Sequence, residues 1–236
     1  MIKHRQKLGI TLLSTISLLL VFLIIQFFQW GFVQLGAYIS DFDGKIVWSA
    51  FGLVVNSESW NFQQIIWIYF FPLAGFLLLY ILLDLFPRYP VKMAKWILLT
   101  YAWAFLLVFL MVFFMPLMEI IQRKGIYHVL NWLSFSRLEQ MFFGIILLLF
   151  FIFKMFRIST LFSTSLIIPS FQLVEKKQIT SQLLYLWLIP FMILCLIVFI
   201  TSNLSFPFPI NYFLFGIVIV LFINTWVIRL YNVIVK

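Results

Sequence analysis

Charged residues are scarce in this sequence. Among 236 residues, 16 are Lys or Arg and 7 are Asp or Glu, so 10% of the chain is charged. Soluble domains carry about 25%. Hydrophobic residues make up 65%, which is more than a soluble fold of this size could bury. These proportions exclude an ordinary soluble enzyme and a disordered tail, and they predict an all-α integral membrane protein.

Cysteine and histidine are also rare. The single cysteine, Cys195, excludes an intramolecular disulfide. The two histidines, His4 and His128, fall on opposite sides of the membrane in the topology predicted below, which excludes a His-rich zinc or haem site within one chain. The nucleophile and nucleotide motifs G-x-S-x-G, the phosphate loop and G-x-G-x-x-G are missing. We therefore expect no catalytic residue, no metal and no cofactor, and the balance is against an enzyme.

Long apolar runs are what the chain has in abundance. About 20 apolar residues in a helix cross the roughly 30 Å hydrocarbon core of a bilayer, and a helix satisfies its own backbone groups there. Six runs predict six transmembrane helices in one polytopic domain that covers residues 1–236: 8–28, 65–86, 96–118, 134–153, 183–201 and 210–228.

The basic residues predict the orientation of these spans. If the N-terminus is cytoplasmic, 12 of the 16 Lys and Arg residues lie inside and 4 lie outside, in agreement with the positive-inside rule. The four outside are Lys45, Arg123, Lys124 and Arg137. Both termini are therefore predicted to be cytoplasmic, in a multi-pass protein of a cell (inner) membrane. The net charge of +9 is an orientation signal in contact with the lipid bilayer, and no nucleic-acid partner is expected.

Two connections are long enough to hold structure. The external loop 29–61 contains Gly31, Gly36 and an Asp43-Gly44 pair, which predicts a short hairpin turn, while 46–55 is a strand or a re-entrant piece. We interpret Gly31 and Gly36 as loop glycines. The cytoplasmic segment 154–182 is predicted to be interfacial, with 158–174 as a re-entrant or interfacial helix.

Ionisable residues are almost missing from the predicted spans, which argues against a proton relay or a voltage sensor. Those near the outer end of the fourth span form a candidate outer vestibule: Glu119, Arg123, His128, Arg137 and Glu139. The alternative is a solvated loop with an Arg137–Glu139 pair at a helix start, where a carboxylate suits the helix dipole. Asp84 and Arg88 form a candidate pair at the inner end of the second span.

Proline and phenylalanine give further indications. Pro72, Pro116 and Pro190 each interrupt a predicted span, and such breaks occur at binding sites in transporters. The chain has 31 Phe but 9 Gly, and no alanine follows Ala104. Close helix contacts in membranes use small residues. This composition therefore favours a lipid-embedded subunit or a site for an apolar ligand.

Six spans with both termini inside resemble the permease subunits of ATP-driven exporters. The resemblance implies a permease-like or accessory membrane subunit that handles an apolar or lipid-like substrate with a partner chain, either a cytoplasmic ATPase or another membrane subunit. Alternatively, the chain resembles the intramembrane site-2 zinc proteases in the order of three segments. These are an Asp-Gly pair, then Phe71-Pro72-Leu73-Ala74-Gly75, then residues 131–139. Because residues 25–30 read IQFFQW where those proteases have H-E-x-x-H, that resemblance implies a metal-free, non-catalytic scaffold.

Overall fold

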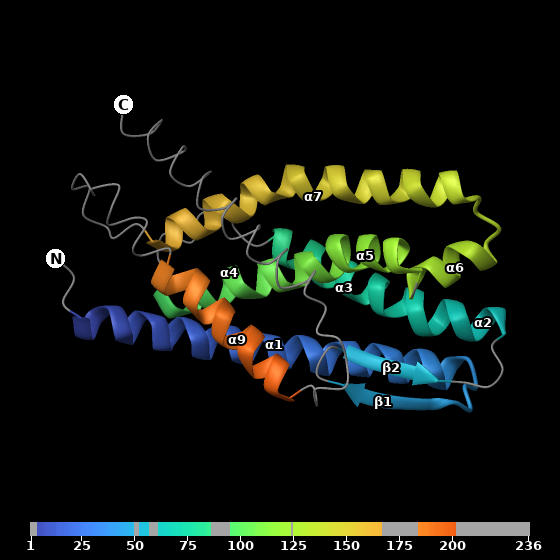
Figure 1. Ribbon diagram of the computed structural model, residues 1–236, viewed down its shortest axis with the longest axis horizontal. Helices are drawn as coiled ribbons and strands as arrows, with labels where there is room; N and C mark the ends of the chain where they lie inside the picture. The colour runs from blue at the N-terminus through green and yellow to red at the C-terminus, as the bar shows by residue number, and fades with distance from the viewer. Residues whose placement is uncertain are drawn as a thin grey trace. The chain divides into compact units, whose positions relative to one another are not determined.

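The computed structural model describes residues 4–49, 52–56, 61–85, 95–123, 125–166 and 184–201. The described chain is helical apart from one hairpin, which agrees with the predicted all-α fold (Figure 1). It divides into two compact units, residues 1–22, 90–104 and 155–236 in one and 23–89 and 105–154 in the other. The predicted span 210–228 and residues 167–182 of the interfacial segment lie outside the described residues.

Three helices are long and apolar enough to cross a membrane, namely Leu8–Ile39, Phe62–Leu85 and Trp96–Ile121. They fit a membrane-embedded protein. The helix at 184–201 is shorter in its apolar part, Leu184–Leu194.

Helix α1, His4–Ile39, is longer than predicted. The expectation that the first span ends at residue 28 and that a loop follows is wrong, because residues 29–39 remain helical and include Gly31 and Gly36. The helix ends where Asp41 adopts a left-handed φ of 48°. The Phe42 N–H then donates to the Ala37 carbonyl at 3.0 Å and the Asp41 N–H to the Tyr38 carbonyl at 3.4 Å. This is a Schellman ending with aspartate in the place usually taken by glycine.

A β-hairpin follows α1, as predicted, but its turn is elsewhere. Strands β1, Lys45–Ser49, and β2, Gly52–Asn56, pair antiparallel with Lys45 opposite Asn56 and Ser49 opposite Gly52. The turn is therefore between Ser49 and Gly52, and the prediction that Asp43-Gly44 forms it is wrong. Those two residues instead connect the left-handed exit of α1 to β1.

Three further apolar helices contain a π-helical turn. Helix α2, Phe62–Ile65, continues through η1, Ile66–Phe70, into α3, Phe71–Leu85. Helix α4, Lys95–Phe109, continues through η2, Leu110–Phe114, into α5, Met115–Gln122. The turn η3, Leu184–Leu188, precedes α9, Ile189–Thr201.

Every π turn ends two residues before a proline, namely Pro72, Pro116 or Pro190. Proline has no N–H, and its ring collides with the carbonyl four residues back. Widening the preceding turn moves that carbonyl away, so the interruptions predicted from the three prolines take the form of π turns.

Helices α6, Ile126–Trp132, and α7, Arg137–Leu166, complete the described chain. Helix α7 runs without a break through the predicted span boundary at residue 153, so the prediction that a separate helix begins at residue 158 is wrong over 158–166. Arg123 and Ser134, with φ of 57° and 62°, stop α5 and α6 as Asp41 stops α1.

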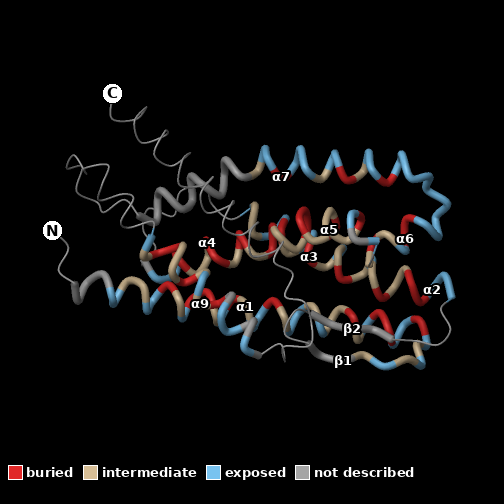
Figure 2. The backbone as a smooth tube through the Cα atoms, in the orientation of Figure 1, coloured by how far each residue is buried: buried red, intermediate tan, exposed pale blue. Residues whose placement is uncertain are grey.

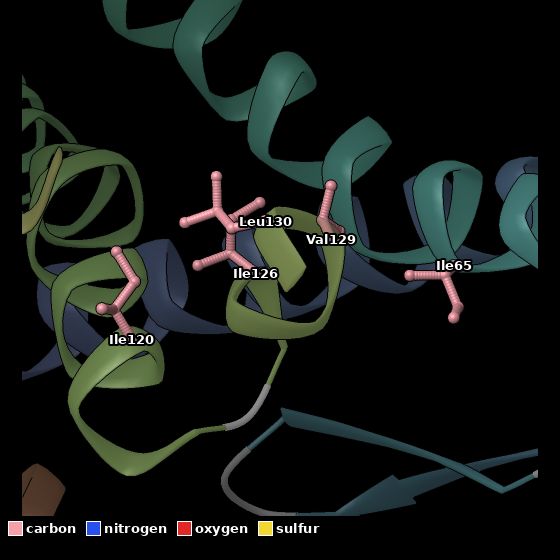
Figure 3. Packing of buried hydrophobic residues seen from close by; sticks show 5 residues of the cluster. All are labelled: Ile65, Ile120, Ile126, Val129 and Leu130. Carbon is pink, nitrogen blue, oxygen red and sulfur yellow. The ribbon is translucent and has the colours of Figure 1, made fainter. Parts of the chain in front are cut away.

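The core of the second unit is aromatic and aliphatic. Tyr80 of α3 lies with its ring centroid 5.5 Å from that of Phe105 and 5.3 Å from that of Phe113, and Phe109 stacks on Phe151 of α7 at 5.1 Å. Buried aliphatic side chains of α2, α5 and α6 form a further cluster, in which Figure 3 shows Leu130 and Ile126 side by side. The cluster consists of Ile65, Ile120, Ile126, Val129 and Leu130.

Over residues 137–154, where the structure describes its side chains, helix α7 is packed mainly along one side (Figure 2). Gln140, Gly144 and Phe151 are buried, while most of the apolar residues between them are exposed. Phenylalanine side chains therefore lie both in the interior of the unit and on the exposed apolar surface of α7.

Gly36 of α1 lies in close contact with the backbone of η1. A Cβ atom at Gly36 would overlap the Trp67 carbonyl group in η1. Likewise, a Cβ atom at Gly75 of α3 would meet the ring of Phe32. Gly31, in contrast, has no neighbour within 4 Å of the position of its Cβ. Gly36 and Gly75 are thus contact residues of the kind that membrane helices use for close packing.

Candidate functional site

Glu119 supports the connection between α5 and α6. Its carboxylate accepts a hydrogen bond from the Ile126 N–H at 2.8 Å, the first backbone donor of α6. Gly125 passes so close to this carboxylate that a Cβ atom there would overlap it, and its φ of 51° also favours glycine. Glu119 thereby acts as the cap of α6, because an acceptor satisfies a helix N-terminal donor.

His128 and Arg123 lie near this turn but are exposed. The His128 ring centroid is 6.4 Å from that of Tyr69 and 5.6 Å from that of Tyr127. Arg123 occupies the left-handed position that ends α5. The two basic side chains are accessible, while Glu119 is engaged with the backbone.

Glu139 belongs to a capping box at the start of α7. The Ser136 N–H and hydroxyl donate to the Glu139 carboxylate at 2.6 and 2.7 Å, and the Glu139 N–H approaches the Ser136 oxygen at 3.4 Å. The sequence Ser-x-x-Glu at 136–139 encodes this reciprocal arrangement. Arg137 stands exposed on the same turn.

The five residues of the candidate vestibule therefore do not form one hydrogen-bonded cluster. Within the described part of the chain, no hydrogen bond or ion pair joins two of Glu119, Arg123, His128, Arg137 and Glu139. Both carboxylates cap helices, and a charged side chain fixed in this way is poorly placed to change partners during a reaction.

At the opposite end of α3, Asp84 pairs with Lys154 of α7, with 3.6 Å between Oδ2 and Nζ. The same Nζ lies 5.9 Å from the centroid of the Tyr80 ring. Arg88, the predicted partner of Asp84, lies outside the described residues. The contact joins the ends of the predicted second and fourth spans, which an alternating up-and-down order of spans places on the same side.

A buried polar chain in the first unit could not be identified from the sequence. Ser14 of α1, fully buried, donates its hydroxyl hydrogen to the Leu186 carbonyl at 2.5 Å and accepts the Trp103 indole N–H at 3.0 Å. Leu186 stands four residues before Pro190, so its carbonyl is the one that a proline deprives of its helical N–H donor. The available signal was the combination of Pro190 with serines in an otherwise apolar helix.

An open cavity of about 420 Å³ lies at the C-terminal end of α1, beside the start of β1. The sequence does not predict this cavity, because its pattern favours a loop over residues 29–39, which the structure shows to be helical. The signal was the apolar character of this segment, which continues the first span. The lining residues are Gln34, Ala37, Tyr38, Asp41, Phe42, Gly44 and Ile46.

Within the residues that the structure describes, no group of three or more His, Cys, Asp or Glu side chains is arranged to hold a metal ion. Comparisons of the chain with protein-family models, with curated proteins and with solved structures give no match.

Proposed function

We propose that this chain is a permease-like or accessory membrane subunit of a cell inner membrane, with six spans and both termini cytoplasmic. It acts on an apolar or lipid-like substrate together with a partner chain, such as a cytoplasmic ATPase. The observation that carries the proposal is the recurrence of a π turn before Pro72, Pro116 and Pro190 in three apolar helices. π turns are frequent at functional sites, and broken helices build the substrate sites of many transporters.

The distribution of charge supports an uncharged or amphiphilic substrate. Helix α1 from Leu8 to Ile39 carries no charged residue, the helix at 62–85 carries only Asp84 near its end, and the helix at 96–121 only Glu119 near its end. Ion- and proton-coupled carriers place charged residues at membrane depth. A partner chain would then supply the energy.

The outward surface supports a lipid-embedded subunit. Along α1, exposed apolar residues recur at helical spacing, and α7 exposes apolar residues around much of its surface. Such surfaces suit lipid or neighbouring helices. The Asp84–Lys154 contact supports a topology in which the inner ends of the predicted second and fourth spans lie on the same side of the membrane.

Reconstitution tests this function. The tagged chain is purified from native membranes together with any partner, incorporated into vesicles, and assayed for transbilayer movement of a fluorescent phospholipid with and without ATP. We expect an ATPase subunit to co-purify and lipid movement to require it. A chain that purifies alone and moves no lipid, with topology reporters showing an external C-terminus, would refute both the function and the six-span topology.

Pro116→Ala offers a specific variant for the same assay. Alanine at position 116 supplies the backbone N–H that proline lacks, and this N–H can donate to a carbonyl of the preceding turn. We therefore expect a more regular helix, unchanged association with the partner and reduced lipid movement. Unchanged movement in this variant would remove the observation on which the proposal depends.

A further inference from the structure

We propose that the cavity at the C-terminal end of α1 binds the ammonium group of a phospholipid headgroup. The inference rests on the proposed function, because it names the headgroup of the lipid-like substrate. The volume of the cavity, about 420 Å³, lies within the range of small-ligand sites, about 300–1,000 Å³.

The position of the cavity is that of a headgroup site. The apolar part of α1 has 32 residues, which span about 48 Å at 1.5 Å per residue. The hydrocarbon core of a bilayer is about 30 Å thick. The last turns of α1, which line the cavity, therefore reach the level of the headgroups when the helix crosses the membrane.

The charge among the lining residues favours a cation. Asp41 places a carboxylate in its lining, and no basic residue is among the described residues that line it. The cavity also adjoins the C-terminal end of a helix, where the dipole is negative and cations are stabilised. An anionic ligand would meet repulsion from both.

The remaining lining groups suit an ammonium ion in particular. The rings of Tyr38 and Phe42 offer π faces, which attract alkylammonium groups, and the Gln34 amide oxygen can accept one of their N–H hydrogens. Gln34 is half-buried and Asp41 is exposed, so the cavity is open to a ligand that arrives from the interface. A primary ammonium, with three donors, makes the fullest use of this lining.

The backbone of the site is held in place by the helix end itself. The Ser40 hydroxyl donates to the Gly36 carbonyl at 2.8 Å, and the Schellman bonds of Asp41 and Phe42 hold the residues that follow. Asp41 keeps a left-handed φ of 48°, a conformation that asparagine also adopts readily. The substitution Asp41→Asn therefore removes the charge and leaves the backbone unchanged.

Native mass spectrometry of the full chain in detergent provides the test. The protein is titrated with phosphatidylethanolamine, with phosphatidylglycerol, and with free ethanolamine as a competitor. We expect phosphatidylethanolamine to bind more tightly than phosphatidylglycerol, and Asp41→Asn to weaken its binding about 1.4-fold to fivefold, the range for one accessible ion pair. Asp43→Asn, which removes an equal charge two residues away and outside the lining, is the matched control and should bind as the wild type does.

A second variant protects the test against a folding defect. Tyr38 is 83% exposed, so Tyr38→Leu removes a ring without disturbing the interior, and it should weaken binding about twofold to fivefold. Competition by millimolar ethanolamine would assign the site to any alkylammonium, and the absence of competition would assign it to the whole lipid headgroup. Either result is consistent with ammonium binding if Asp41→Asn reduces the preference for phosphatidylethanolamine over phosphatidylglycerol.

Equal binding of the two lipids, or equal effects of Asp41→Asn and Asp43→Asn, would overturn the proposal. The outcome is separable from that of the proposed function. Ammonium binding that depends on Asp41, in a chain that moves no lipid, would leave the site standing and refute the permease. Lipid movement by a chain that binds the two lipids equally would leave the permease standing and refute the site.

Discussion

Replacing Ser14 by alanine tests the buried polar chain of the first unit. The serine hydroxyl joins two groups, the Leu186 carbonyl at 2.5 Å and the Trp103 indole N–H at 3.0 Å. Ser14→Ala removes both hydrogen bonds at a position that is 0% exposed, so water cannot replace them. Hydrogen bonds between membrane helices contribute about 0.6 kcal/mol on average and at most about 1.7 kcal/mol each. Two of them give an expected loss of about 1–3 kcal/mol in the free energy of unfolding.

The assay is unfolding of the purified chain by sodium dodecyl sulfate in mixed micelles, followed by tryptophan fluorescence. Trp103 and Trp187, whose ring centroids are 4.5 Å apart, report on the same region. Thr15→Ala is the matched control, because the Thr15 hydroxyl donates to the Thr11 carbonyl of its own helix at 2.8 Å, and its removal leaves no interhelical group exposed.

A double-mutant cycle with Trp103→Phe sharpens the result. If the indole N–H and the serine act on each other, the double variant should lose less stability than the sum of the single variants. A Ser14→Ala variant within about 0.3 kcal/mol of the wild type would refute the reasoning, since additive errors reach about that size.

Three further perturbations test other contacts. Gly36→Ala should lower the free energy of unfolding by about 1–3 kcal/mol through overlap with the neighbouring helix, while Gly31→Ala should be neutral or stabilising in the same titration; equal effects would contradict the close contact. Glu139→Ala should lower the thermal midpoint and Glu139→Gln should restore it, because Gln also completes a capping box; a Gln variant as unstable as the Ala variant would argue against capping. Asp84→Asn and Lys154→Met in a double-mutant cycle should show a coupling of about 0–1 kcal/mol, as expected for a pair that is one-quarter exposed, and a coupling above about 2 kcal/mol would show that the pair is buried in lipid.

The apolar runs predict the helices well, because a membrane leaves the backbone few other choices. Their ends are predicted less well, for a specific reason. Asp41, Arg123 and Ser134 occupy the left-handed positions that stop three helices, whereas glycine is the usual signal for such a stop. In a chain with few glycines these stops cannot be seen in the sequence, and the predicted first span therefore ends eleven residues before helix α1 does.

The candidate site shows the same limit. The capping box at 136–139 is local and could be identified from Ser136 and Glu139 alone. The partner of Ser14, in contrast, lies 172 positions away, and the left-handed turn that brings Asp41 beside Gln34 depends on where α1 ends. Local sequence carries no information on the partner of Ser14 and only an ambiguous signal for the turn at Asp41.

The π turn η1 also corrects the phase of the helix that contains it. Buried positions recur every four residues from 64 to 80, at Gln64, Ile68, Pro72, Phe76 and Tyr80. In an α-helix each step of four residues turns about 40° past a full circle, so four steps would carry the stripe about 160° around the axis. A π turn accommodates about one additional residue, which takes back roughly 100°. The wide turn thus allows a strict four-residue repeat to keep facing the same neighbours, and a helical wheel without this offset would assign Tyr80 to the membrane when it lies in the core.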